Sequence, residues 1–176
     1  MMSVLAILGE WTTAAKSGWD VVGLAALIAS VLAYLYFGLR LAWIDARTHL
    51  LPNRLMFPWA KWAASLLVVA GLAHGAPDRV FGALAGGVVL FGGYLLLHLV
   101  QRNGMGMGDV KLAFVLGLYL GFVSWWHVLW GTLLAFVLGS LFALGGMIAG
   151  KMGRKSAIPF GPFMIVGALV ALTIGR

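Results

Sequence analysis

The sequence predicts an all-α fold, a polytopic integral membrane protein with about six transmembrane helices. Hydrophobic residues make up 62% of the 176-residue chain, charged residues only 10%, and the mean hydropathy is +1.02. A soluble domain of this size would expose much of that apolar surface to water. The apolar residues also form continuous runs rather than short alternating segments, which favours helices over a β-barrel.

Six apolar stretches are long enough, or nearly long enough, to span a bilayer at about 20 residues each. They cover residues 21–43, 57–75, 80–100, 109–125, 127–149 and 159–175. The second follows Leu51-Pro52-Asn53, the fourth follows the glycine-rich segment 103–108, and the sixth opens with a proline in its first turn. We expect residues 1–20 to be a short extracytoplasmic lead-in and residues 21–176 to form a single transmembrane domain.

The basic residues between the stretches predict the orientation, because cytoplasmic connections of membrane proteins are enriched in Lys and Arg. They gather around the first, third and fifth connections (Arg40, Arg47, Arg54 and Lys61; Arg102 and Lys111; Lys151, Arg154 and Lys155). The second connection has Arg79 beside Asp78, and the fourth has no Lys or Arg. The odd-numbered connections are therefore predicted to be cytoplasmic and both termini to lie outside.

Two of the five acidic residues, Asp45 and Asp109, lie at the edges of different apolar stretches and on the same predicted side. Carboxylates beside membrane spans are costly to keep and are functional candidates by default. The chain has no cysteine, which excludes a cysteine nucleophile and a thiolate metal site. Two carboxylates that share one proton can hydrolyse a peptide bond without metal or cysteine, and their pKa values then belong to the pair.

The position of each acid on its helix suggests a division of roles. Gly104, Gly106 and Gly108 cannot continue a stable helix, so Asp109 would open the fourth span near its positive dipole end. Asp45 would lie at the C-terminal end of the first span, where the dipole opposes ionisation. We therefore hypothesise that Asp109 is the stronger base and that Asp45 more often holds the shared proton.

Three segments together resemble a known family. Asp45 followed by Leu51-Pro52-Asn53, then Gly106-Met107-Gly108-Asp109-Val110-Lys111-Leu112, then Pro159-Phe160-Gly161-Pro162-Phe163 is similar to the bacterial type IV prepilin peptidases, which are membrane aspartyl proteases of the GxGD type. The resemblance covers about residues 25 to 176.

The resemblance implies that Asp45 and Asp109 are the catalytic aspartates. It also implies that the chain removes the basic leader of prepilins or pseudopilins, for type IV pili or secretion, at the cytoplasmic face of the bacterial inner membrane. Larger family members carry an N-terminal domain with paired CxxC motifs that is linked to N-methylation. Because this sequence has no cysteine and about 20 residues before its first span, N-methyltransferase activity is not expected.

Further residues are candidates for binding the substrate or supporting the two acids: Gly106, Gly108, Lys111, Asn53, Pro159 and Gly161. Each also has a simpler interpretation. Lys111 can snorkel to lipid phosphates, Asn53 can begin a turn or helix, and the Pro159 segment can initiate a helix. The histidines lack metal-ligand spacing, so no metal or cofactor is expected. The expected partners are the prepilin substrate and membrane lipids, with no nucleic acid.

Glycine pairs with small-xxx-small spacing occur at Gly82/Gly86, Gly117/Gly121 and Gly146/Gly150. Such pairs let helices approach closely, and packing within one chain is favoured here over dimerisation. The oligomeric state is left open.

Three other functions compete with prepilin processing. The first is a GxGD protease that acts on another membrane substrate, such as signal-peptide remnants. The second is a small ion- or proton-coupled transporter that uses the same acids, although the sequence shows none of the internal symmetry common in transporters. The third is an assembly subunit without catalysis, which would give no reason for two intact acids.

Overall fold

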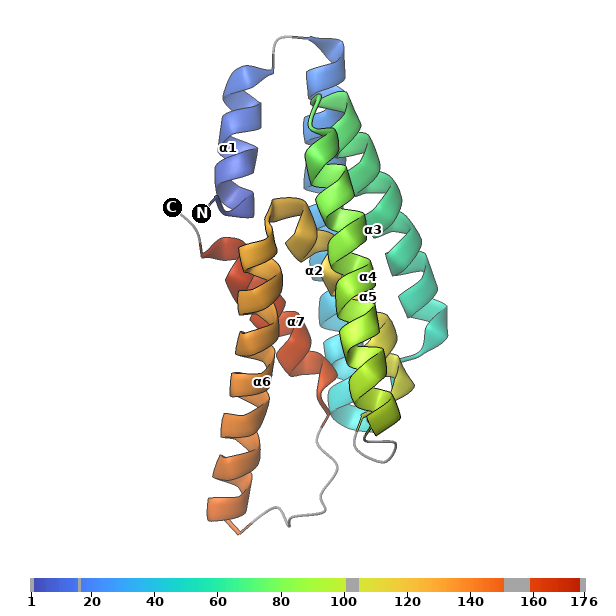
Figure 1. Cartoon of the computed structure of the whole chain (residues 1–176), viewed down its shortest axis with the longest axis vertical. Helices are drawn as coiled ribbons and strands as arrows, with labels where there is room; N and C mark the ends of the chain where they lie inside the picture. The colour runs from blue at the N-terminus through green and yellow to red at the C-terminus, as the bar shows by residue number, and fades with distance from the viewer. Residues whose placement is uncertain (1, 16, 101–104, 151–158, 175–176) are drawn as a thin grey trace.

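The computed structural model describes residues 2–15, 17–100, 105–150 and 159–174. These residues form an elongated bundle of helices (Figure 1): α1 Val4–Ala14, α2 Gly18–Thr48, α3 Asn53–Ala73, α4 Pro77–Val100, α5 Met107–Val123, α6 Trp125–Ile148 and α7 Gly161–Thr173. The all-helical prediction is confirmed. We call the end of the bundle at which α2 and α4 finish and α3, α5 and α7 begin the site end.

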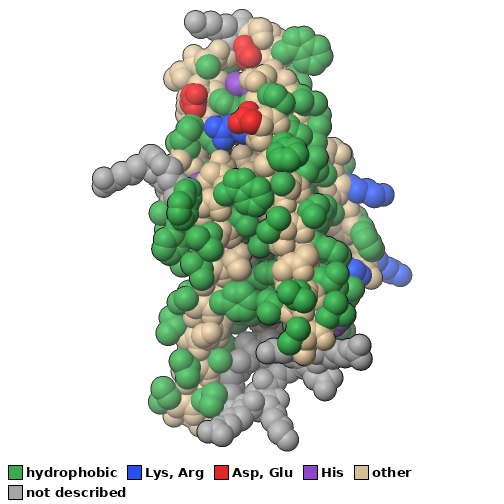
Figure 2. Space-filling model, viewed as in Figure 1, with side chains coloured by type: hydrophobic (Ala, Val, Ile, Leu, Met, Phe, Trp, Pro, Cys, Tyr) green, Lys and Arg blue, Asp and Glu red, His purple; other side chains and the backbone are tan. Residues whose placement is uncertain are grey.

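Four helices, α2, α3, α4 and α6, are long and apolar enough to cross a membrane. Hydrophobic side chains cover much of the visible surface (Figure 2), as expected for a protein that faces lipid. Helices α5 and α7 take the places of the fourth and sixth predicted spans but contain 17 and 13 residues. At 1.5 Å per residue, α7 is about 20 Å long, shorter than the hydrocarbon core of about 30 Å.

Helix α5 lies at the centre of the packing. Of its 17 residues, 11 are buried, and they cover every side of the helix. A helix that is apolar all round belongs in an interior, and here the neighbouring helices supply that interior. Asp109 lies in the first turn of α5, just before this buried part of the helix.

Helices α4 and α5 run antiparallel and approach closely through the predicted glycine pairs. A Cβ atom added at Gly82 would lie 2.6 Å from the backbone oxygen of Gly121, and one at Gly86 would lie 2.6 Å from that of Gly117. No side chain fits at these contacts, because real Cβ atoms do not come that close to a carbonyl oxygen. These two glycine pairs therefore serve packing within the chain.

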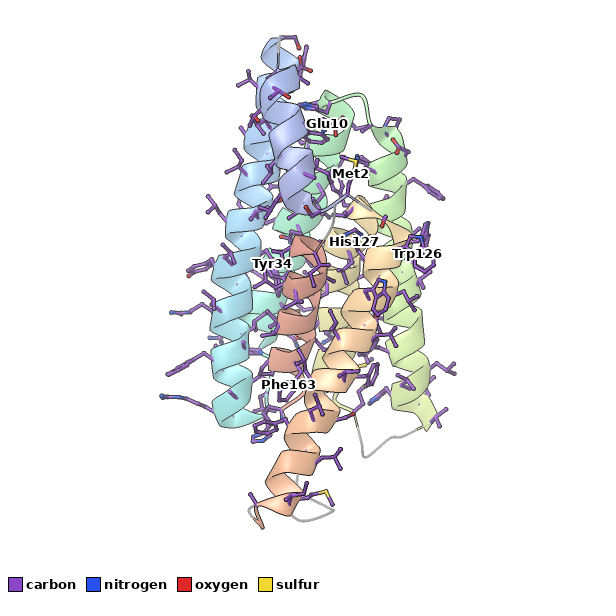
Figure 3. The ribbon with its side chains drawn as sticks, turned by 90° about the vertical axis from the view of Figure 1, so that its left-hand side faces the viewer. Met2, Glu10, Tyr34, Trp126, His127 and Phe163 are labelled. Carbon is purple, nitrogen blue, oxygen red and sulfur yellow. The ribbon has the colours of Figure 1, made fainter. Side chains whose placement is uncertain are left out.

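The sequence did not predict α1 as a helix of its own. Residues 4–14 form a helix that Ser3 caps, and its Ile7 and Trp11 are buried. The Trp11 ring stacks on His74 with 3.8 Å between ring centroids and meets Phe122 edge-on. This helix covers the end of the bundle opposite the site end, where Glu10 lies far from Phe163 of α7 (Figure 3).

Candidate active site

Asp45 lies in the last turn of α2, close to where the helix ends. His49 takes the left-handed conformation (φ 54°) and its N–H donates to the backbone oxygen of Asp45 at 2.8 Å, which closes the helix. The Asp45 side chain is only 4% exposed. One of its oxygens, Oδ2, accepts a hydrogen bond of 3.0 Å from the backbone N–H of Gly161 at the start of α7. Helices α2 and α7 therefore meet at this carboxylate.

Asp109 is the third residue of α5 and helps to begin that helix. Gly106 is the N-cap residue, and its N–H donates to Oδ2 of Asp109 at 3.3 Å. In return, the Asp109 N–H donates to the Gly106 carbonyl at 3.1 Å. The glycine-rich approach thus places Asp109 in the first helical turn, as the sequence predicts, with its side chain half-buried.

The structure brings the two acids together. Both lie at the site end, and the Asp45 carboxylate acts electrostatically on Asp109. The other three acids, Glu10, Asp20 and Asp78, lie at or near the opposite end, on α1 and in the first turns of α2 and α4. Figure 2 shows acidic side chains near the top, with basic atoms beside them, and further lysine and arginine along the right flank. Asp45 and Asp109 are therefore the two carboxylates available for chemistry at this end.

Leu51, in the connection between α2 and α3, separates the segments that carry the two acids. A Cβ atom at Gly108 would meet Leu51 Cβ at 2.9 Å, and one at Gly161 would meet Leu51 Cδ2 at 3.5 Å. Leu51 thus touches the residue before Asp109 on one side and the residue that binds Asp45 on the other. Because Leu51 lies between the two glycines, it keeps the segment that carries Asp109 apart from the segment that binds Asp45.

Replacing Gly108 with alanine should lower kcat/KM for a reaction that uses the two acids by about tenfold, because an overpacked contact costs about 1–3 kcal/mol. The penalty should shrink in a Leu51→Gly background, which removes the atoms that the new methyl group meets. The rates of Gly108→Ala, Leu51→Gly and the double variant, compared with wild type, measure how strongly the two positions interact. An equal penalty in both backgrounds would show that Leu51 is not the obstacle.

A hydrogen bond between Lys111 and Asn53 connects α5 to α3. Lys111 Nζ donates to Asn53 Oδ1 at 2.9 Å and lies 5.5 Å from the centre of the Phe57 ring. Asn53 begins α3, as expected for a helix-start residue, and its side-chain oxygen binds Lys111. Pro159 lies just before Phe160, the N-cap residue of α7. Of the candidate supporting residues, Gly106 and Gly161 therefore bind the carboxylates through their backbone N–H groups, and the others shape the surroundings.

His98, in the last turn of α4, holds the segment that leads to Asp109. Its Nδ1 lies 2.7 Å from the carbonyl oxygen of Met105, the residue before the Gly106 cap. Because a carbonyl oxygen only accepts hydrogen bonds, Nδ1 must carry the proton. This contact could not be predicted from sequence, because a histidine that binds a backbone carbonyl leaves no motif.

His98→Asn should therefore keep the activity of the site within about threefold of wild type, because the asparagine amide nitrogen lies about as far from Cα as Nδ1. His98→Gln places its amide nitrogen nearer the position of Nε2 and should lose up to about tenfold, the value of one hydrogen bond of about 0.5–1.5 kcal/mol. Both rates are measured at matched amounts of folded protein. Equal activity of the two variants would show that the contact with Met105 does not matter.

Comparison with known proteins identifies the class. Residues 32–144 match the model of the type IV leader peptidase family. The match covers more than half of the chain, and the chain belongs to this family.

The relatives agree with this assignment. The chain is 34% identical over 148 residues to leader peptidase HopD of Salmonella typhimurium, an alignment that covers 78% of this chain and 87% of HopD. It is also 34% identical over 159 residues to a prepilin leader peptidase/N-methyltransferase of Aeromonas salmonicida, covering 90% of this chain and 51% of the relative. The chain thus spans about half the length of that bifunctional relative. No solved structure matches the chain significantly.

Proposed function

We propose that this chain is an aspartyl endopeptidase that removes the basic leader of type IV prepilins or pseudopilins at the cytoplasmic face of the inner membrane. The observation that carries the proposal is the pairing of Asp45 and Asp109 at one end of a membrane bundle. The family and the names of the relatives support leader peptides as substrates. N-methylation, which the name of the longer relative includes, is not part of the proposal.

In the proposed reaction the two acids share one proton. Asp109 takes a proton from water as the water oxygen forms a bond to the scissile carbonyl carbon, and Asp45 gives its proton to the carbonyl oxygen. The resulting diol collapses, the C–N bond breaks, and the nitrogen receives the proton that Asp109 had taken. A hydroxyl proton of the diol returns to Asp45 as the carboxyl product forms, so one water is consumed and both acids are restored.

The helix ends support this division of roles. Asp109 lies in the first turn of α5 and Asp45 in the last turn of α2, the two positions on which the hypothesis from sequence depends. The Gly161 N–H donates to one Asp45 oxygen, which leaves the other oxygen to carry the transferable proton. Asp109 is more accessible than Asp45, as a group that must meet water requires.

The proposed topology follows from charge. Arg47, Arg54, Lys61 and Lys111 lie on the site-end halves of their helices, so the excess of basic residues predicts that this end faces the cytoplasm. A prepilin leader would then approach from the cytoplasm while the hydrophobic segment after it stays in lipid. Cleavage at the boundary between the two needs acids near a membrane face, and the positions of Asp45 and Asp109 at the ends of α2 and α5 support this part of the proposal.

The proposal is tested with purified protein in liposomes and a type IV prepilin that carries its basic leader. Intact-mass spectrometry should show loss of the leader at a single peptide bond by wild type and no loss with the double variant Asp45→Asn/Asp109→Asn. A substrate whose leader lysines and arginines are replaced by glutamine tests the need for a basic leader. No cleavage by folded wild type would favour another membrane substrate or the transporter alternative.

A further inference from the structure

Tyr94 of α4 differs from the other buried tyrosines of the described bundle. The Tyr34 hydroxyl donates to the backbone oxygen of Ile165 at 2.7 Å, and the Tyr119 hydroxyl donates to that of Ser30 at 3.0 Å. Tyr94 is equally buried, at 3% exposed. Yet its hydroxyl forms no hydrogen bond within the described part of the chain. The hydroxyl is also not among the fully enclosed polar atoms that lack a partner in the described residues, so its oxygen keeps some accessible surface where a ligand can accept its hydrogen bond.

The register of α4 against α5 places Tyr94 beside the active site. Gly82 meets Gly121, and Gly86 meets Gly117, one turn further along both antiparallel helices. Two more turns in the same register bring Tyr94 opposite Asp109. Two observations agree with this continuation. Leu90 and Ala113, the intervening pair, line one small cavity together with Tyr94, and Tyr94 and Asp109 interact electrostatically.

The Tyr94 ring also reaches the side of the site that holds Asp45. It stacks on Phe136 with 5.8 Å between centroids and lies 6.4 Å from the ring of Phe160. Phe160 directly precedes Gly161, whose N–H binds Asp45. Aromatic contacts therefore hold the Tyr94 ring between the Phe160–Gly161 segment, which binds Asp45, and the Asp109 carboxylate. The Tyr94 hydroxyl is left without a hydrogen-bond partner among the described residues.

We propose that Tyr94 is a third catalytic residue, whose hydroxyl donates a hydrogen bond to the scissile carbonyl oxygen as water adds to the carbonyl carbon. The π electrons of the carbonyl move onto that oxygen in this step, and a fixed donor stabilises the developing charge more than it stabilises the bound substrate. Tyr94 keeps its proton throughout, so the proton balance of the two aspartates is unchanged. This role rests on the proposed peptidase function.

The test is Tyr94→Phe, which removes the oxygen and keeps the ring between Phe136 and Phe160. We expect kcat for prepilin cleavage to fall about 10²-fold, with KM and unfolding temperature near wild type, because loss of one donor to a developing oxyanion costs about 10²–10³ in kcat. Tyr34→Phe is the matched control. Tyr34 lies midway along the bundle, well away from Phe163 at the start of α7 (Figure 3). Its loss should lower the unfolding temperature and leave kcat unchanged.

The outcomes separate this proposal from the peptidase proposal. Wild-type kcat in Tyr94→Phe, with cleavage abolished in Asp45→Asn and Asp109→Asn, would overturn the role of Tyr94 alone. A loss that vanishes when rates are divided by the folded fraction would also overturn it, because it would reflect packing. If the aspartate variants still cleave the substrate, the two-aspartate mechanism fails first, whatever Tyr94→Phe does.

Discussion

Asp45→Asn and Asp109→Asn should each reduce the kcat of leader cleavage by about 10³-fold or more, with little change in KM. Asparagine has nearly the shape of aspartate but can neither take a proton from water nor give one to the carbonyl oxygen, and such transfers contribute about 10²–10⁴-fold each. In the proposed mechanism the two acids act on one proton, so losing either should disable both halves of the reaction. The double variant should therefore be no slower than the slower single variant, as for other residues that act as a unit.

Asp78→Asn supplies the matched control, since Asp78 lies in the first turn of α4 at the opposite end of the bundle. It makes the same change of charge and should keep wild-type rates. Steady-state cleavage is measured at matched amounts of folded protein in the membrane. Multiplicative losses in the double variant would mean that the acids act in separate steps, and full activity in either single variant would sink the two-aspartate mechanism.

The sequence could predict the apolar helices because a long apolar run has one stable solution in lipid. It could not predict α1, since Glu10, Thr12 and Thr13 interrupt the apolar pattern and the burial of Trp11 depends on meeting His74 of another helix. The observed helix ends also differ from the predicted ends of the apolar stretches. Helix α2 continues to Thr48 rather than ending near Trp43, because the left-handed turn at His49 closes it.

The candidate site also combines residues that the sequence could point to with contacts that it could not. Asp45 and Asp109 could be singled out as candidates from sequence because acids are rare in this chain and each follows or precedes an apolar run. Their partners could not, because each contact joins segments far apart in the chain, as in the bond between Gly161 and Asp45 across 116 positions. The position of Tyr94 beside Asp109 could be predicted only in part. The glycine pairs give the register of α4 on α5, but their pairing is visible only once the two helices are known to be neighbours.

Gly161→Ala should lower kcat about 10²-fold while the protein still folds and reaches the membrane. A Cβ atom at this position would lie 2.7 Å from Asp45 Oδ2 and 3.3 Å from its Cγ, too close for either atom to stay in place. The carboxylate must turn away or α7 must retreat, and either movement weakens the 3.0 Å hydrogen bond that orients Asp45. Displacements of about 1 Å at a reacting group can cost about 10² in rate. Valine, which is larger, should cost more.

The control is Gly92→Ala on α4, where an added Cβ atom meets nothing within 4 Å and alanine favours the helix. Leu51→Gly distinguishes the two glycines of the site. It should relieve Gly108→Ala, which meets Leu51, but not Gly161→Ala, whose nearest obstacle is the Asp45 carboxylate itself. Rescue of both variants by Leu51→Gly would mean that Leu51, rather than contact with Asp45, makes Gly161 necessary. Normal cleavage by Gly161→Ala would show that the hydrogen bond to Asp45 is a structural turn contact with no part in catalysis.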